Sequence, residues 1–111
     1  MVNQLNGGSA DYVESNGEVV NVTLTGTAAV TIVEQSWGAF QIAVTGPRAG
    51  DPLLCCSVSK RGPTSAVVIG NVVADPADDG CQLGIDWPNG RSLQLAKSIA
   101  SHNGTYSVSL H

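Results

Sequence analysis

Residues 104–110, GTYSVSL, alternate polar and apolar side chains over their whole length. Because successive side chains of a β-strand point to opposite faces, Tyr106, Val108 and Leu110 share one face, and a threonine and two serines share the other. A strand that is apolar on one side and polar on the other is typical of an antiparallel sheet with one face on the core.

The same period of two recurs along the chain, and no apolar stripe at helical spacing competes with it. In EVVNVTL (18–24), Val20, Val22 and Leu24 share a face opposite Asn21 and Thr23. The other candidate strands are TAAVTIV (27–33), GAFQIAV (38–44), LLCCSVS (53–59), AVVIGNVV (66–73), CQLGIDW (81–87) and RSLQL (91–95). Only residues 93–103 could hold a turn of helix.

Turn-forming residues separate these segments, as in GPRAGDP (46–52), ADPADDG (74–80) and DWPNG (86–90). Strands that recur every 8–12 residues or so with such punctuation indicate a sandwich or barrel. The length of 111 residues fits a single domain. We therefore predict an all-β antiparallel β-sandwich of the jelly-roll or Ig-like kind, with about eight strands, over residues 11–111.

Two of the segments, 53–59 and 66–73, are apolar on both faces for part of their length. This pattern is expected at the centre of a sandwich, or where a second subunit covers the outside. A chain of this size would otherwise expose an apolar patch larger than the few hundred Å² that monomers tolerate. We expect an oligomer of identical subunits whose shared surface includes parts of 53–58 and 66–73, with Leu53, Val68 and Val72 as interface residues.

Residues 1–10, MVNQLNGGSA, lack alternation and contain little apolar surface beyond Val2 and Leu5. Alone they cannot offset the entropy of ordering their own backbone, about 1–2 kcal/mol per residue. We expect an N-terminal arm, residues 1–10, that lies extended against a neighbouring protein subunit, with Val2 and Leu5 as its apolar anchors.

The three cysteines, Cys55, Cys56 and Cys81, do not form a pattern that predicts a disulfide or metal site. Adjacent side chains on a strand point to opposite faces, so Cys55 and Cys56 could not both reach one metal ion without a bulge. We predict that all three are reduced, that at least two are buried, and that the protein has no metal or other cofactor.

Charge and hydropathy restrict the possible partners. The formal net charge is -4, and the five basic residues are scattered rather than aligned, so nucleic acid is not expected as a partner. No apolar run approaches the roughly 20 residues of a membrane span, and the N-terminus lacks the features of a secretory signal. The sequence predicts a protein that is made and kept in a cytosol, without a membrane partner.

No combination of residues predicts catalysis. His102 lies in a polar turn and His111 is the last residue, and neither shares a motif with a nucleophile. Glu34 and Asp86 could form a glycosidase pair only if the fold brought them together. The acidic segment 74–80 is interpreted as a hairpin loop with Gly80 at its tight position, rather than as a calcium site.

The two tryptophans, Trp37 and Trp87, lie next to turns. Such aromatic residues could stack on a sugar, as in lectins, or close the ends of the sandwich. We predict that both close the sandwich, because Trp87 continues the inward-facing alternation of Cys81, Leu83 and Ile85.

The C-terminal third of the chain, NGRSLQLAKSIASHNGTYSVSL (89–110), resembles the small accessory β-domains of tailed bacteriophage virions. These domains include head decoration (cement) proteins, head fibres and tail-fibre tips. The resemblance implies a trimeric or multimeric structural protein, assembled in the host cytoplasm, that has no catalytic residues. It is also the reason to expect a homotrimer rather than a dimer at the shared surface. Decoration proteins of this kind commonly occupy three-fold positions of the shell and hold capsid subunits with an N-terminal segment.

The sequence thus leads to the hypothesis of a capsid decoration protein on the virion surface. Its partner would be the major capsid protein, and it would stabilise the shell. One alternative is a fibre-tip or lectin-like receptor-binding or carbohydrate-binding module, which predicts an exposed aromatic side chain and a polar pocket at a loop end. A second alternative is a small hydrolase, which predicts a cleft with converging carboxylates.

Overall fold

A computed structural model describes residues 18–111, which form two antiparallel sheets packed face to face. One sheet has five strands in the order β1-β8-β3-β4-β5, and the other has three in the order β2-β7-β6. The strands are β1 (Glu18–Leu24), β2 (Val30–Val33), β3 (Gly38–Thr45), β4 (Leu53–Lys60), β5 (Val67–Asp75), β6 (Leu83–Asp86), β7 (Leu93–Lys97) and β8 (Gly104–Leu110). The predicted all-β sandwich and its eight strands are confirmed.

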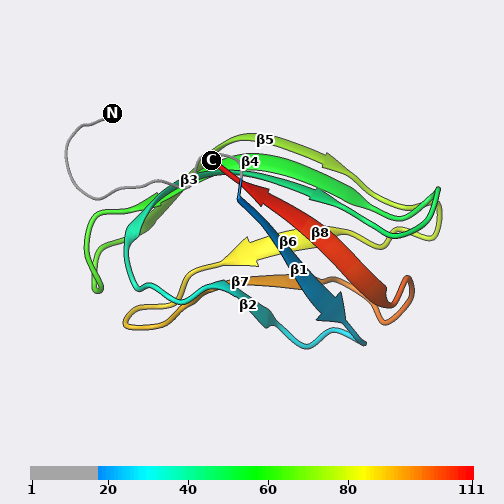
Figure 1. Cartoon of the computed structure of the whole chain (residues 1–111), viewed down its shortest axis with the longest axis horizontal. Coiled ribbons are helices and arrows are strands. Elements are labelled where there is room, and N and C mark those ends of the chain that lie inside the picture. Colours follow the sequence, from blue (N-terminus) through cyan, green and yellow to red (C-terminus); the bar gives the residue numbers. More distant parts are fainter. Residues whose placement is uncertain (1–17) are drawn as a thin grey trace.

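Figure 1 shows β3, β4 and β5 as a long layer that runs above β6, β7 and β2, while β8 and β1 cross obliquely. The last strand, β8, inserts between β1 and β3. In an Ig domain the first two strands pair with each other, whereas here β1 and β2 belong to different sheets. The strand order is therefore not that of an Ig domain.

The connections divide between the two ends of the sandwich. Loops 25–29, 46–52, 76–82 and 98–103 lie at one end, which we call the Asp51 end. Loops 34–37, 61–66 and 87–92 lie at the other end, which we call the Trp37 end. Residue His111, which follows β8, also lies at the Trp37 end, because β8 starts at the Asp51 end.

The core lies between the sheets and consists of the inward-facing side chains that the alternation predicted. Tyr106, Val108 and Leu110 are almost completely buried, as are Leu93 and Leu95 on the facing sheet. Burial of this apolar surface, at roughly 25 cal/mol per Å², is the main term that stabilises the fold. The five-stranded sheet is wider than its partner, so the two inner faces do not cover each other completely.

Three expectations from the sequence need correction. Residues 93–103 contain β7 and a turn, and no helix occurs within the described residues. Trp37 is 54% exposed and does not close the sandwich, although Trp87 does. The acidic segment 74–80 connects β5 to β6 in the opposite sheet, so it is not a hairpin, although Gly80 does adopt a positive φ of 88° there.

Trp87 closes the Trp37 end from inside. Its side chain is 2% exposed, and its indole Nε1 donates a hydrogen bond of 2.9 Å to the Gln35 carbonyl. Its ring lies 6.0 Å from that of Phe40, between centroids. The buried indole is thus both packed and hydrogen-bonded, as a tryptophan in a core requires.

Within residues 18–111 we find no helix with the length and apolar character needed to cross a membrane.

Candidate functional site

Strand β5 is the most unusual surface feature of the described chain. It forms one edge of the five-stranded sheet and pairs only with β4. The backbone N–H and C=O groups along its free edge therefore have no strand partner within residues 18–111. Four of its apolar side chains are exposed: Val68 (65%), Ile69 (42%), Val72 (54%) and Val73 (65%). Edge strands of soluble proteins are usually protected from pairing by charges, prolines or bulges. Strand β5 contains a bulge, but its only charged residue is Asp75 at its last position.

The register with β4 determines which way each β5 side chain points, because residues directly opposite each other lie on the same face. Ile69 lies opposite the buried Val58, so it faces the inner side of the sheet. Val68 lies opposite Ser59 and Val73 opposite Cys55, so both face the outer side.

A bulge interrupts this alternation in the middle of β5. Cys55 pairs with Val73 and Ser57 with Gly70, which leaves Asn71 and Val72 together opposite Cys56. Asn71 has a positive φ of 52°, a conformation that asparagine tolerates better than most residues. Because of the extra residue, the side chain of Val72 faces the inner side of the sheet, as that of Ile69 does. Both side chains overhang the narrower sheet, which means that they extend beyond its edge.

The structure brings three of the predicted interface residues to this edge. Val68 and Val72 belong to β5, and Leu53, which is 41% exposed, lies on the outer side of β4 opposite Asp75. Val2 and Leu5 fall outside the described residues. The predicted list missed Ile69 and Val73, although both belong to the same apolar run. The one sequence signal for this run was that it is apolar on both faces, and the interior strand β4 has the same signal.

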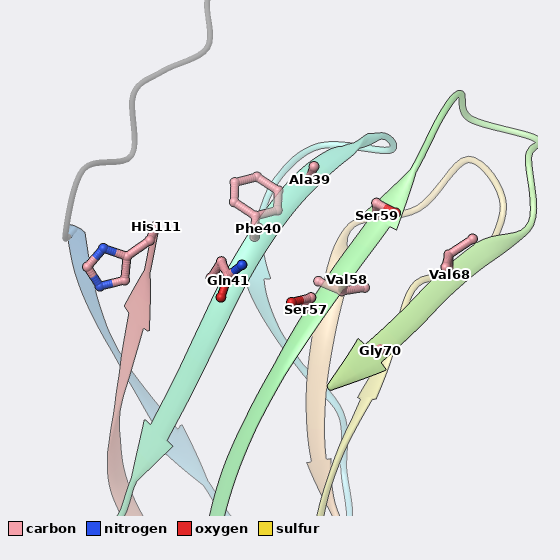
Figure 2. Close-up of a pocket in the computed structure, with 9 residues that line it drawn as sticks. All are labelled: Ala39, Phe40, Gln41, Ser57, Val58, Ser59, Val68, Gly70 and His111. Carbon is pink, nitrogen blue, oxygen red and sulfur yellow. The ribbon is translucent and has the colours of Figure 1, made fainter. Parts of the chain in front are cut away.

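An open hollow of about 290 Å³ adjoins β5 on the outer side of the sheet. Figure 2 shows that its lining comes from β3, β4 and β5 and from His111. The polar side chains there are Gln41, Ser57, Ser59 and His111. His111 Nε2 is 3.0 Å from the Ser109 hydroxyl. No aspartate or glutamate among residues 18–111 lines the hollow, so the described part of the chain places no pair of acidic side chains there.

The cysteines occupy the two faces of β4 and one loop. Cys56 and Cys81 are buried, Cys55 is exposed, and none of them forms a disulfide. Burial raises the pKa of the Cys56 thiol, and the neighbouring Cys55 adds to this effect. The prediction that at least two cysteines are buried is confirmed. Among the described residues, no group of three or more histidine, cysteine, aspartate or glutamate side chains could hold a metal ion.

The Asp51 end contains a polar cluster that the sequence did not predict. Asp51 is buried, and its carboxylate accepts hydrogen bonds from the Arg48 backbone N–H at 2.9 Å and from the Arg48 guanidinium at 3.3–3.4 Å. His102 Nδ1 lies 2.8 Å from Asp51 Oδ1, and its Nε2 lies 3.3 Å from Asp79 Oδ1. These residues come from three different loops, so no local pattern could have linked them.

The electrostatics of this cluster favour a charged Asp51. Burial alone would raise the pKa of Asp51, but the hydrogen bonds from His102 and Arg48 outweigh it, so the pKa lies below its usual value. Tyr106 donates a hydrogen bond of 2.7 Å to the His102 carbonyl. Burial raises the pKa of Tyr106 to about 12, and the charge of Asp51 adds to this effect.

Two buried lysines hold loops in place through hydrogen bonds. Lys97 at the Asp51 end donates to the Ser101 carbonyl at 2.5 Å and to Asn103 Oδ1 at 2.6 Å. Lys60 at the Trp37 end donates to the Ser65 carbonyl and to Asn89 Oδ1. Buried ammonium groups need several hydrogen bonds to offset their desolvation, and here the acceptors are loop oxygens.

The contacts of this polar cluster join three loops at the Asp51 end. Both nitrogens of His102 face carboxylates, and none of its side-chain hydrogen bonds among the described residues involves a serine, threonine or cysteine. A catalytic base would need a nitrogen directed at a nucleophile or a substrate.

The exposed aromatic side chain and the polar pocket of a lectin-like site are at opposite ends of the molecule. A polar pocket of about 390 Å³ lies at the Asp51 end and includes Arg48, Asp51, Asp75 and Asp78. The exposed Trp37 lies at the other end. This arrangement differs from the one that the lectin-like alternative requires.

No known protein family, curated protein or solved structure matches this chain. The class of protein must therefore be inferred from the sandwich and its apolar edge.

Proposed function

We propose that this protein is a non-catalytic structural protein that decorates a larger protein assembly, namely the outer surface of a virus capsid. The observation that carries the proposal is the apolar edge strand β5, which exposes Val68, Ile69, Val72 and Val73 and has a single charge. Surfaces of this kind mark sites of contact with other protein. The resemblance of residues 89–110 to virion accessory domains supplies the kind of assembly.

The stabilising mechanism is mass action. A protein that binds only the assembled shell stabilises it by RT ln(1 + [L]/Kd), which is about 3–4 kcal/mol per site at 100 to 1,000 times Kd. Many copies on one shell multiply this effect. The major capsid protein is the proposed partner, and residues 1–10 are the proposed attachment arm, with Val2 and Leu5 as anchors. The three-fold arrangement expected from the resemblance stays a prediction.

Imaging tests the proposal. The chain should carry a small C-terminal tag in the cells that produce it, and gold-labelled antibody should then be located on purified particles by electron microscopy. Label distributed over the heads supports the decoration role. Label confined to a tail tip favours the fibre-tip alternative. A chain that co-purifies with no particle contradicts the proposal.

A further inference from the structure

We infer that β5 pairs with the β5 strand of a second copy of this chain, antiparallel and about a two-fold axis, so that the two five-stranded sheets become one continuous sheet. This inference names a partner for the β5 surface, in place of the homotrimer that was expected there, and rests on the proposed structural role only for its biological setting. It follows from the order of side chains along β5 and from the position of the bulge.

The residue order of β5 is nearly symmetric about the bond between Gly70 and Asn71. Apolar residues precede this bond at 67–69 and follow it at 72–74. A two-fold axis there places residue i opposite residue 141 minus i of the partner. The resulting pairs are Val67 with Ala74, Val68 with Val73, Ile69 with Val72, and Gly70 with Asn71.

The bulge makes this register possible. In a regular strand, two residues whose numbers add up to an odd value have side chains on opposite faces, because side-chain direction alternates from one residue to the next. The extra residue at Asn71–Val72 shifts the second half of β5 by one position, so each pair now shares a face. Val68 and Val73 meet on the outer side, and Ile69 and Val72 meet on the inner side. Two-fold registers with even sums would place paired residues from the two sides of the bulge on opposite faces.

The charges on β5 agree with this pairing. Its one charged residue, Asp75, lies at the end of the strand. In the proposed register Asp75 falls opposite Ala66 of the partner, so two like charges never face each other. The two overhanging side chains, Ile69 and Val72, would be covered by their counterparts, and the unpaired edge would gain hydrogen bonds.

The size of the contact predicts a weak dimer. A standard stable interface uses about 20–30 residues and about 800 Å² on each partner, whereas β5 supplies nine residues. Dimerisation should therefore be visible at high protein concentration, and it should strengthen when attachment to a common surface raises the effective concentration to about the millimolar range. On a decorated shell, neighbouring copies would join in pairs.

The register gives a complementation test with the full-length chain. Ile69→Lys and Val72→Asp each place a charge against an apolar partner, so each should weaken dimerisation about tenfold or more. When the two variants are mixed, Lys at 69 of one copy meets Asp at 72 of the other, and Val72 meets Ile69 at the second site. Sedimentation equilibrium from about 10 μM to 1 mM should show that the mixture associates more strongly than either variant alone.

Val19→Lys is the matched control. Val19 is 59% exposed on β1, at the other edge of the same sheet, and takes no part in the β5 pair. This variant should dimerise like the wild type. Circular dichroism melts of all three variants should match that of the wild type, because the substituted side chains are exposed.

Several results would overturn the inference. These are a wild-type chain that stays monomeric at 1 mM, a trimer, a dimer that Val19→Lys weakens as much as Ile69→Lys does, or no recovery in the mixture. A trimer that Val19→Lys weakens would indicate that β5 of each copy pairs with β1 of the next copy. Labelled heads with a monomeric chain would reject the pairing alone, whereas a dimer found on no particle would reject the decoration role alone.

Discussion

The main chain at Gly46 lies directly against the side chain of Asp51 in the polar cluster. A Cβ atom at this position would lie 2.4 Å from the Cβ of Asp51 and 2.7 Å from its Oδ2. Neither the buried carboxylate nor its backbone can move without losing the hydrogen bonds from Arg48 and His102. We predict that Gly46→Ala lowers the free energy of unfolding by about 1–3 kcal/mol, the range for overpacking.

Urea denaturation monitored by circular dichroism measures this effect. Gly84→Ala is the matched control, because a Cβ there meets nothing within 4 Å and Gly84 has an ordinary φ. Equal stability of the two variants would show that the contact between Gly46 and Asp51 is not tight in solution.

The cysteines provide a second prediction at this scale, through their different exposure. Cys55 is exposed, whereas Cys56 and Cys81 are buried. A thiol reagent should label one cysteine rapidly in the native protein and the other two only on unfolding, as mass spectrometry of the labelled peptides can establish. Cys81→Ser should lower the free energy of unfolding by roughly 1–3 kcal/mol, because a serine hydroxyl is costly to bury. Rapid native labelling of Cys56 or Cys81 would contradict the assigned positions.

The lowered pKa of Asp51 predicts an acid-sensitive contribution to stability. A carboxyl group with a folded pKa below its unfolded value of about 3.9 stabilises the protein above that value. The contribution is lost as the pH falls through the folded pKa. The difference in unfolding free energy between wild type and Asp51→Asn should be constant above about pH 5 and should shrink below about pH 4. Urea titrations from pH 6 to pH 2 measure it, and a difference that stays constant throughout would contradict the prediction.

At the scale of single elements, β7 shows how a strand can hold the loop that follows it. Lys97 is the last residue of β7, continues the buried face of Leu93 and Leu95, and donates to Ser101 and Asn103 in the connection to β8. Asn103 Oδ1 also accepts a hydrogen bond from the Gly26 backbone N–H, which links this connection to the loop after β1.

We predict that Lys97→Met lowers the free energy of unfolding by about 1–3 kcal/mol, because it removes the ammonium donor from the Ser101 carbonyl and leaves Asn103 Oδ1 with only the Gly26 N–H. Arg91→Met is the control, since Arg91 is exposed. Thermal denaturation compares the two variants. A Lys97→Met protein as stable as Arg91→Met would mean that water replaces the ammonium group.

Strand β5 illustrates a limit of sequence prediction at the same scale. Its apolar run predicted a strand, and the structure confirms one. The same pattern fits a central strand covered on both sides and an edge strand that awaits a partner. Only the strand order shows that β4 is central and β5 is at the edge. Strand order depends on contacts between residues far apart in the chain, which local periodicity does not encode.

At the scale of the whole molecule, the proposed arm and the described sandwich should act independently in folding. Deletion of residues 1–10 should leave the melting temperature nearly unchanged, because these residues offer little apolar surface to the core. The same deletion should sharply weaken attachment to particles, as measured by co-sedimentation with heads. Unchanged attachment would mean that residues 1–10 are not the attachment arm.

The sequence by itself determined the fold class, the positions of the strands and most of the core. Alternation places Tyr106, Val108 and Leu110 on one face wherever the strand lies, because side-chain direction in a strand is a local property. It also assigned Cys55 and Cys56 to opposite faces, as the structure has them.

The tertiary structure alone decided which surfaces stay open and which polar groups meet. Asp51 and His102 are 51 residues apart and come together only because β3, β4, β7 and β8 all have a loop at the same end of the sandwich. The exposure of Trp37, the burial of Lys97 and the overhang of β5 likewise depend on how the two unequal sheets are stacked. Stacking is a long-range arrangement, and the periodicity of a single strand contains no information about what lies above or beside it.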